Sequence, residues 1–255
     1  MFLPVEALFS AWLSWRCRYE TTTGTAAPAA VNRMDGVKTL GVLGGMGPAA
    51  TVAFLARMQA LTPANGDEDH IRVVMDMNPQ VPNRHTQPEA AGRTLGEMAL
   101  RLKAGGAEVL AMPCNTAHAH AAAIRAAGLP FVDMVAETAR AAKAGGATRI
   151  GVLATPGGEA LYAEALAAEG VETVRLSAVE RDRFMAVVAG VKAGDVGPEQ
   201  RAAMRELAAA LVAAGAQGVI GGCTEVPLLL DAGDVAVPLT DSAEMLARMC
   251  VAACL

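Results

Sequence analysis

From residue 38 onward, short apolar runs alternate with longer stretches rich in alanine and leucine. The short runs contain many β-branched residues, which is typical of strands, and the longer stretches end at glycines such as Gly105 and Gly128, which is typical of helices. Strands are predicted at 39–43, 71–75, 109–112, 131–134, 149–153, 172–176 and 219–222. Helices are predicted at 48–61, 89–104, 116–127, 161–168, 198–214 and 242–254. Strands alternating with helices predict an α/β fold with parallel sheets and right-handed crossovers.

The alternation repeats after about 110 residues. KTLGVL at 38–43 resembles TRIGVL at 148–153, and GAEVLAMPC at 106–114 resembles GAQGVIGGC at 215–223. Two matches at nearly the same offset predict a duplicated unit, and therefore two similar α/β domains related by a pseudo-twofold axis. We place the first domain at 36–134 plus 238–255 and the second at 135–237.

Each copy of the unit carries one cysteine at the same place. Cys114 and Cys223 both come just past the carboxyl end of a predicted strand. Open α/β sheets bind their ligands at that edge. If the copies are related by a pseudo-twofold axis, the two cysteines face each other across the cleft between the domains.

Composition narrows the function classes. The 255 residues are 53% hydrophobic and 4% aromatic, with a net charge of −5 and no cluster of Lys and Arg, so nucleic-acid binding is not expected. The five cysteines form no CxxC pair and no Cys/His ligand set, which argues against a disulfide framework and a zinc site. A reducing, cytoplasmic location is expected.

The first 35 residues differ from the rest of the chain. Residues 2–15 are apolar, but Glu6 interrupts them and no basic residue precedes them. This stretch matches the pattern of a signal peptide only weakly and is too short to span a bilayer, so we expect no membrane association. Residues 21–30 have the Thr, Ala and Pro composition of a linker. We expect residues 1–35 to form a poorly ordered extension.

Two opposed cysteines suit one reaction in particular. Racemisation removes a proton from one face of a tetrahedral carbon and returns a proton to the other face, so it needs an acid and a base on opposite sides. A free thiol titrates near pH 8.5, and a modest shift yields a thiolate at neutral pH. We expect Cys114 and Cys223 to lie near helix N-termini, whose free N–H groups favour a thiolate and bind a carboxylate.

Other interpretations fit parts of the chain. The glycines at 41–47 follow a strand and precede a helix, and Asp76 ends the second strand, which would suit a nucleotide. Their spacing is not GxGxxG, however, and a tight turn near a small anion explains them equally well. The side chains of His118 and His120 do not point to the same side of a helix, so metal binding there is not expected. Cys17, Cys250 and Cys254 are interpreted as small buried hydrophobes.

Five segments resemble the aspartate racemase branch of the aspartate/glutamate racemase family. They occur in the family's order over about 215 residues, from residue 38 to the C-terminus. They are GVLGGMGP at 41–48, NPQVPNR at 78–84, MPCNTAH at 112–118, GVLAT at 151–155 and GCTEVPLL at 222–229.

The resemblance implies two flavodoxin-like domains with the active site between them, and neither pyridoxal phosphate nor a metal. It implies that Cys114 and Cys223 are the paired acid and base, and that Arg84 binds the side-chain carboxylate of the substrate. Arginine suits this role because its planar fork holds a carboxylate with two hydrogen bonds. Lys192 is either a second cation or a surface lysine at a helix end. The remaining implied substrate-binding residues are Met46, Gly47, Asn115, Thr116, Thr155 and Thr224.

The chain also departs from the family pattern. The family often has Pro-Asp-Arg-Thr where this chain has PNRH at 82–85, and Thr-Gly-Thr where it has PGG at 156–158. Glutamate racemases have a histidine at the position of Glu225, which favours the aspartate side of the family. These departures affect the substrate more than the reaction.

The expected activity is interconversion of L- and D-aspartate, or of a close acidic amino acid. The resemblance suggests a homodimer. A broad-specificity amino-acid racemase, or a related isomerase or decarboxylase, stays open as an alternative. So, less favoured, does a protein that only binds a small molecule or a nucleotide. The intact cysteine pair argues against the decarboxylase and against the binding protein.

Overall fold

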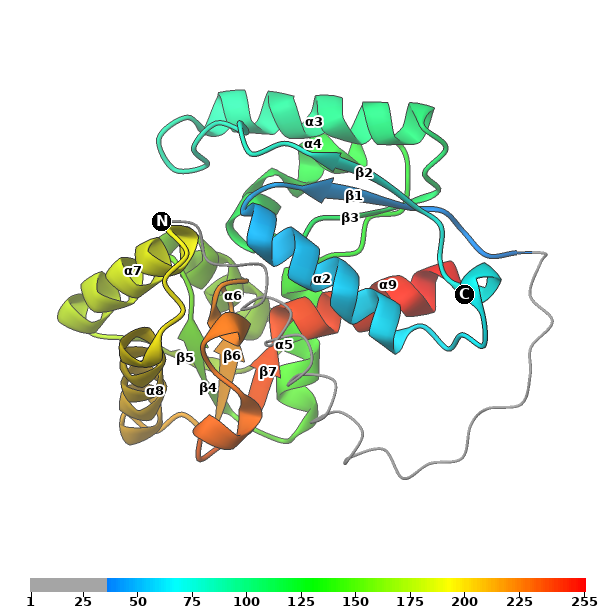
Figure 1. The fold of residues 1–255 in the computed structure, drawn as a ribbon. Helices are drawn as coiled ribbons and strands as arrows, with labels where there is room; N and C mark the ends of the chain where they lie inside the picture. Colours follow the sequence, from blue (N-terminus) through cyan, green and yellow to red (C-terminus); the bar gives the residue numbers. More distant parts are fainter. Residues whose placement is uncertain (1–35) are drawn as a thin grey trace. The chain divides into compact units, whose positions relative to one another are not determined.

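The computed structural model describes residues 36–255, which form one compact unit, so the prediction for residues 1–35 lies outside the described residues. Two parallel sheets organise this part (Figure 1). The first sheet has the order β2-β1-β3, with β1 at Leu40–Gly44, β2 at Val73–Met77 and β3 at Val109–Ala111. The second has the order β5-β4-β6-β7, with β4 at Arg149–Leu153, β5 at Glu172–Val174, β6 at Gly218–Gly221 and β7 at Leu239–Asp241.

The strand order confirms the predicted duplication. β1, β2 and β3 occupy the positions that β4, β5 and β6 occupy in the second sheet, and every pairing is parallel. In the second sheet, β7 lies beside β6. At the equivalent place beside β3, the first sheet has only a parallel bridge between Leu110 and Phe131. The predicted strand at 131–134 is therefore reduced to one bridge, because a helix already begins at Met134.

Helices cover the sheets and complete the crossovers. Within residues 36–255, no helix is long and apolar enough to cross a membrane. Short 3₁₀ turns lie at Asp67–Asp69, Thr116–His120, Val226–Leu228 and Ala232–Asp234. The α-helices are α2 (Pro48–Leu61), α3 (Pro88–Ala104), α4 (Ala121–Arg125), α5 (Met134–Ala144), α6 (Pro156–Ala168), α7 (Ala178–Lys192), α8 (Pro198–Ala213) and α9 (Ser242–Cys254).

Both faces of each sheet are buried, as expected for parallel sheets. Along β1, Leu40 and Val42 pack toward α2 and α9, whereas Leu43 packs toward α3. Along β4, Ile150 and Val152 pack toward α5 and α6, and Leu153 packs toward α7 and α8. Because these apolar layers fill the interior, the polar side chains of the candidate site lie beyond the ends of the strands.

The C-terminal segment contacts both sheets. β7 pairs with β6 of the second sheet, whereas α9 packs with α2 in the apolar layer of the first sheet. The predicted boundary at residue 238 thus falls just before a strand of the second sheet. The domain boundaries themselves stay a prediction.

Candidate active site

Cys114 and Cys223 lie at equivalent places in the two sheets. Cys114 follows β3 and Cys223 follows β6, and their side chains are buried, with exposed fractions of 5% and 7%. Each cysteine precedes a 3₁₀ turn rather than an α-helix; the predicted helix at 116–127 is such a turn followed by the short α4. The sheet duplication therefore presents two thiols from matched positions.

Burial raises the pKa of both thiols, and it is the largest effect on each. The backbone N–H groups of Ala117 and Glu225 hydrogen-bond to Cys114 and Cys223 respectively and act in the opposite direction. These free N–H groups lie at 3₁₀ turns instead of the expected helix N-termini, and they do not outweigh desolvation. The expectation that the environment favours a thiolate at neutral pH is therefore wrong for both cysteines in this structure.

The two thiols differ in their charged neighbours. The Cys223 thiol donates a hydrogen bond to Oε2 of Glu225 over 2.8 Å, and this buried carboxylate raises the pKa of Cys223 further. Nζ of Lys192 lies 3.9 Å from Oε1 of Glu225, and the lysine side chain is 45% exposed. After burial, the largest influence on the pKa of Cys114 is the positive charge of Arg84, which lowers it. Cys114 is therefore the thiol that ionises more readily.

Glu225 is a candidate site residue that the sequence alone did not single out, and its carboxylate lies within hydrogen-bond distance of the Cys223 thiol. Its position two residues after Cys223 served only to separate this chain from glutamate racemases. The GCTE segment contains a signal for this contact, because a carboxylate two residues after a thiol on a turn can reach that thiol. The structure also places the first loop here, because a side chain at Gly47 would come within 3.9 Å of Glu225.

Arg84 supplies an available positive charge. Within the described residues it forms no ion pair, and its buried Nε atom has no hydrogen-bond partner. Nε2 of His120 is also buried without a partner among residues 36–255, and Arg84 contributes to the lowering of the His120 pKa, after burial. A buried guanidinium N–H without an acceptor is costly, so this region is suited to an anionic group.

Two of the predicted threonines join the two sheets. Oγ1 of Thr116, after β3, lies 2.8 Å from Oγ1 of Thr155, after β4. Thr155 also caps α6, because its hydroxyl accepts a hydrogen bond from the N–H of Gly158. Next to this pair the ring of His85 lies so close to Gly157 that any side chain there would collide with it. His85, one of the departures from the family pattern, thus lies beside the two threonines that are predicted to bind substrate.

The other predicted ligands are also beside the cysteines or the first loop. Met46 and Thr224 are buried, and the Thr224 hydroxyl lies 3.5 Å from Oε2 of Glu225. The Asn115 amide already has protein partners: its Oδ1 accepts a hydrogen bond from Tyr162 and its Nδ2 donates one to Ser242. The substrate-binding roles of these residues stay predictions, and for Asn115 one amide hydrogen is left for a ligand.

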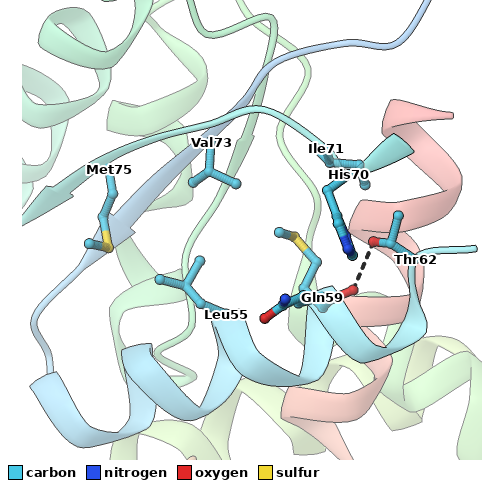
Figure 2. A pocket seen from close by; sticks show the side chains of 8 residues that line it. Leu55, Gln59, Thr62, His70, Ile71, Val73 and Met75 are labelled. Atoms are coloured by element: carbon cyan, nitrogen blue, oxygen red, sulfur yellow. Dashed lines mark hydrogen bonds between the residues drawn. The ribbon is translucent and has the colours of Figure 1, made fainter. Parts of the chain in front are cut away.

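A separate groove lies between α2 and β2, with a volume of about 450 Å³ (Figure 2). Its polar side chains include Thr62, whose hydroxyl donates to the carbonyl of Met58 within α2. None of the predicted site residues lines this groove, and no cysteine does. It is lined by Leu55, Met58, Gln59, Thr62, His70, Ile71, Val73 and Met75.

Comparison with known proteins identifies the family of this chain. Among residues 36–255, no group of three or more His, Cys, Asp or Glu side chains is arranged to hold a metal ion. The family model for Asp/Glu/hydantoin racemases matches residues 43–250, which include both cysteines. The chain belongs to this family.

Relatives of several specificities resemble this Asp/Glu/hydantoin racemase family member. The broad specificity amino-acid racemase RacX of Bacillus subtilis is 26% identical over 224 residues, covering 83% of this chain and 96% of RacX. A glutamate racemase of Pseudomonas aeruginosa is 33% identical over 139 residues, covering 49% of this chain and 48% of that protein. The structure of Picrophilus torridus aspartate racemase superposes with a TM-score of 0.73 at 26% identity, covering 85% of this chain and 94% of that one.

Membership of the Asp/Glu/hydantoin racemase family makes the chain an isomerase of a type that works without pyridoxal phosphate. The fold class predicted from the sequence is confirmed at the same time, since the superposition spans both sheets.

Proposed function

We propose that this racemase interconverts L- and D-aspartate, or a close acidic amino acid, with Cys114 and Cys223 as the acid and base. The observation that carries the proposal is the matched placement of two buried thiols at equivalent strand ends of duplicated sheets. The Thr116–Thr155 hydrogen bond supports it, because it brings the neighbouring strand ends of the two sheets together.

The charges assign the first step to Cys114. Burial and neighbouring charges together raise the pKa of its thiol less than that of Cys223, so in one direction the minor thiolate form of Cys114 removes the α-proton of the bound amino acid. The Cys223 thiol, which Glu225 keeps protonated, then delivers its proton to the opposite face of the carbon. The products are the inverted amino acid, a Cys114 thiol and a Cys223 thiolate, and the reverse reaction restores the starting state. Preorganised hydrogen-bond donors around the α-carboxylate stabilise the carbanion between the two transfers.

Arg84 carries the substrate assignment. Its unpartnered Nε atom and its electrostatic influence on Cys114 support the proposal that it binds the side-chain carboxylate of aspartate. Lys192 adds a second positive charge next to Glu225, on the side of Cys223.

A broad-specificity racemase is the second candidate function. It is favoured by the match to RacX over most of both chains and by the exposed His85 at Gly157, where the loops depart from the family pattern. The two candidates differ in one measurable property, the ratio of kcat/KM for aspartate to that for a neutral amino acid.

Incubation in D₂O tests the reaction. With L-aspartate, we expect D-aspartate that carries deuterium at the α-carbon, because the opposite thiol delivers a proton that comes from solvent. Mutating either cysteine to Ala should reduce racemisation by about 10³-fold or more, because each one acts as a general acid or base. In the proposed assignment, C223A retains α-proton exchange for one enantiomer and C114A for the other.

The matched control is C250A, which removes another buried thiol, in α9 and outside this site, and should keep its racemase activity. Absence of α-proton exchange with aspartate and glutamate would refute the acidic substrate. Full racemisation by either C114A or C223A would refute the two-thiol mechanism.

A further inference from the structure

One tyrosine reaches from the segment of one cysteine to the segment of the other. The Tyr162 hydroxyl donates a hydrogen bond of 2.6 Å to Oδ1 of Asn115, the residue after Cys114. The ring of the same tyrosine packs against Gly222, the residue before Cys223. A side chain at Gly222 would come within 2.7 Å of the ring.

A chain of buried hydrogen bonds runs parallel to this contact. Nδ2 of Asn115 donates to Oγ of Ser242 over 3.1 Å, and Ser242 donates to the carbonyl of Gly221 over 2.7 Å. Asn115 is therefore connected to the end of β6 by two routes, one through the tyrosine ring and one through the serine hydroxyl. Asn115, Tyr162 and Ser242 are all buried.

We propose that Tyr162 is a spacer that fixes the separation and relative orientation of the segments carrying Cys114 and Cys223. This positioning role rests on the proposed two-thiol racemisation. A two-base reaction requires both sulfur atoms to approach one carbon from opposite sides, and an error of about 1 Å in such an arrangement can cost 100-fold in rate. A rigid ring held at both ends, within a satisfied buried network, limits that error.

Tyr162 is not itself suited to transfer the substrate's proton. Burial raises the pKa of its hydroxyl far above neutral pH, and Asn115 already accepts its hydrogen. The side chain is fully buried in the apolar layer that α5 and β4 form with α6, so neither solvent nor a substrate reaches its ring. Its action on the reaction therefore passes through the positions of Cys114 and Cys223.

The fate of the carbanion in D₂O tests the spacer, because either thiol can protonate it and the carbanion partitions between two outcomes, D-aspartate and recovered L-aspartate. In D₂O the wild-type enzyme should place deuterium in D-aspartate, while the L-aspartate recovered early keeps its α-proton. In Y162F the second thiol is less well aligned, so the carbanion more often takes its proton back from the thiol that removed it, and deuterium enters L-aspartate whenever that thiol has exchanged its proton with D₂O. We expect a fall in kcat of about 10- to 100-fold, little change in KM and more deuterium in the recovered L-aspartate.

Two further variants separate positioning from stability. G222A introduces the colliding side chain and should shift the partition in the same direction as Y162F. T62V removes a buried hydroxyl at the end of α2, outside the network, and should leave the partition unchanged. An unchanged partition and an unchanged kcat in Y162F would overturn the proposal.

Hydrogen-exchange mass spectrometry supplies a readout that needs no substrate. In Y162F, loss of the hydrogen bond to Asn115 should speed amide exchange in both 113–117 and 221–225, although the sequence separates these segments by more than 100 residues. Faster exchange confined to α6, or none at all, would contradict the spacer. If the wild-type enzyme racemises no amino acid, the proposed function fails, and this measurement still decides whether Tyr162 couples the two segments.

Discussion

At the scale of single residues, the charge beside each thiol gives two equivalent cysteines different chemistry. Duplication places Cys114 and Cys223 alike, but only Cys223 has a carboxylate within hydrogen-bond distance. Separating the pKa values of two groups that must act as acid and base is a general way to assign their roles. Glu225 thus supplies the asymmetry that the repeated fold does not.

Replacing Glu225 with Gln tests this asymmetry. The glutamate raises the pKa of Cys223, so E225Q should lower that pKa and increase the thiolate fraction, about tenfold for each pKa unit. We expect faster alkylation of Cys223 by iodoacetamide at pH 8, measured by mass spectrometry, and a high-pH limb of kcat/KM displaced to lower pH. E164Q, on the exposed face of α6, is the control. Slower or unchanged alkylation would show that the carboxylate does not hold the thiol proton.

At the scale of elements, one histidine joins the turn after β3 to the start of α5. The N–H of Met134 donates to Nε2 of His118 over 3.1 Å, so Nε2 is unprotonated and Nδ1–H donates to the carbonyl of Cys114 over 2.9 Å. The imidazole is therefore neutral, and burial, its largest influence, lowers its pKa. His118 thus serves structure rather than metal binding, and it fixes the backbone of the cysteine.

This arrangement predicts a specific acid sensitivity. A histidine whose pKa is lowered on folding contributes stability that is present above its unfolded pKa, about 6.5, and lost as the pH falls toward its folded pKa. Urea denaturation of the wild type should therefore show falling stability below about pH 6.5. H118Q should be less stable by about 1–3 kcal/mol at pH 7.5 and should show a shallower pH dependence. H70Q, in the groove beside α2, is the control; an equally steep pH dependence in H118Q would exclude His118 as its source.

The predictability of individual elements follows from how local their signals are. α2 and α9 have the bounds that the pattern predicts, since Pro48 starts one helix and Asp241 caps the other. α7 was missed, although Ser177 and Glu180 form a capping box at its start, a signal readable in the sequence. The helix expected at 116–127 breaks into a 3₁₀ turn and a short helix. Tertiary contacts of His118 and Asn115 hold that segment, and no local pattern encodes them.

At the scale of the whole molecule, duplication made most of the fold and both cysteines predictable. A repeat of about 110 residues requires matched strand ends, so Cys114 and Cys223 follow from sequence alone. The connections between the repeats were not predictable, because Tyr162, Ser242 and Thr155 meet Asn115 and Thr116 only after both halves have folded. The raised thiol pKa values were missed for the same reason, since burial is a property of the assembled fold.

The C-terminal segment makes one of these long-range connections through ions. Arg57 of α2 forms ion pairs with Asp241, at the end of β7, and with Glu244, in the first turn of α9. These side chains are largely buried, with 18%, 19% and 17% exposed. Removing the arginine from such a cluster leaves carboxylates desolvated without their cation. The connection between α2 and the second sheet should therefore contribute to the stability of the whole unit.

Replacing Arg57 with Ala should lower the free energy of unfolding by roughly 3 kcal/mol at pH 8. Burial already raises the pKa of Asp241 even with Arg57 beside it, and losing the guanidinium would raise that pKa further. A group with a raised folded pKa contributes stability that is lost as the pH rises, so the defect of R57A should shrink as the pH is lowered toward 5. Urea denaturation at both pH values measures this. R140A breaks an exposed pair with Glu137 on α5 and should cost less than about 1 kcal/mol at either pH. A defect of R57A that is small, or that grows at pH 5, would show that this cluster does not join the second sheet to α2 through charge.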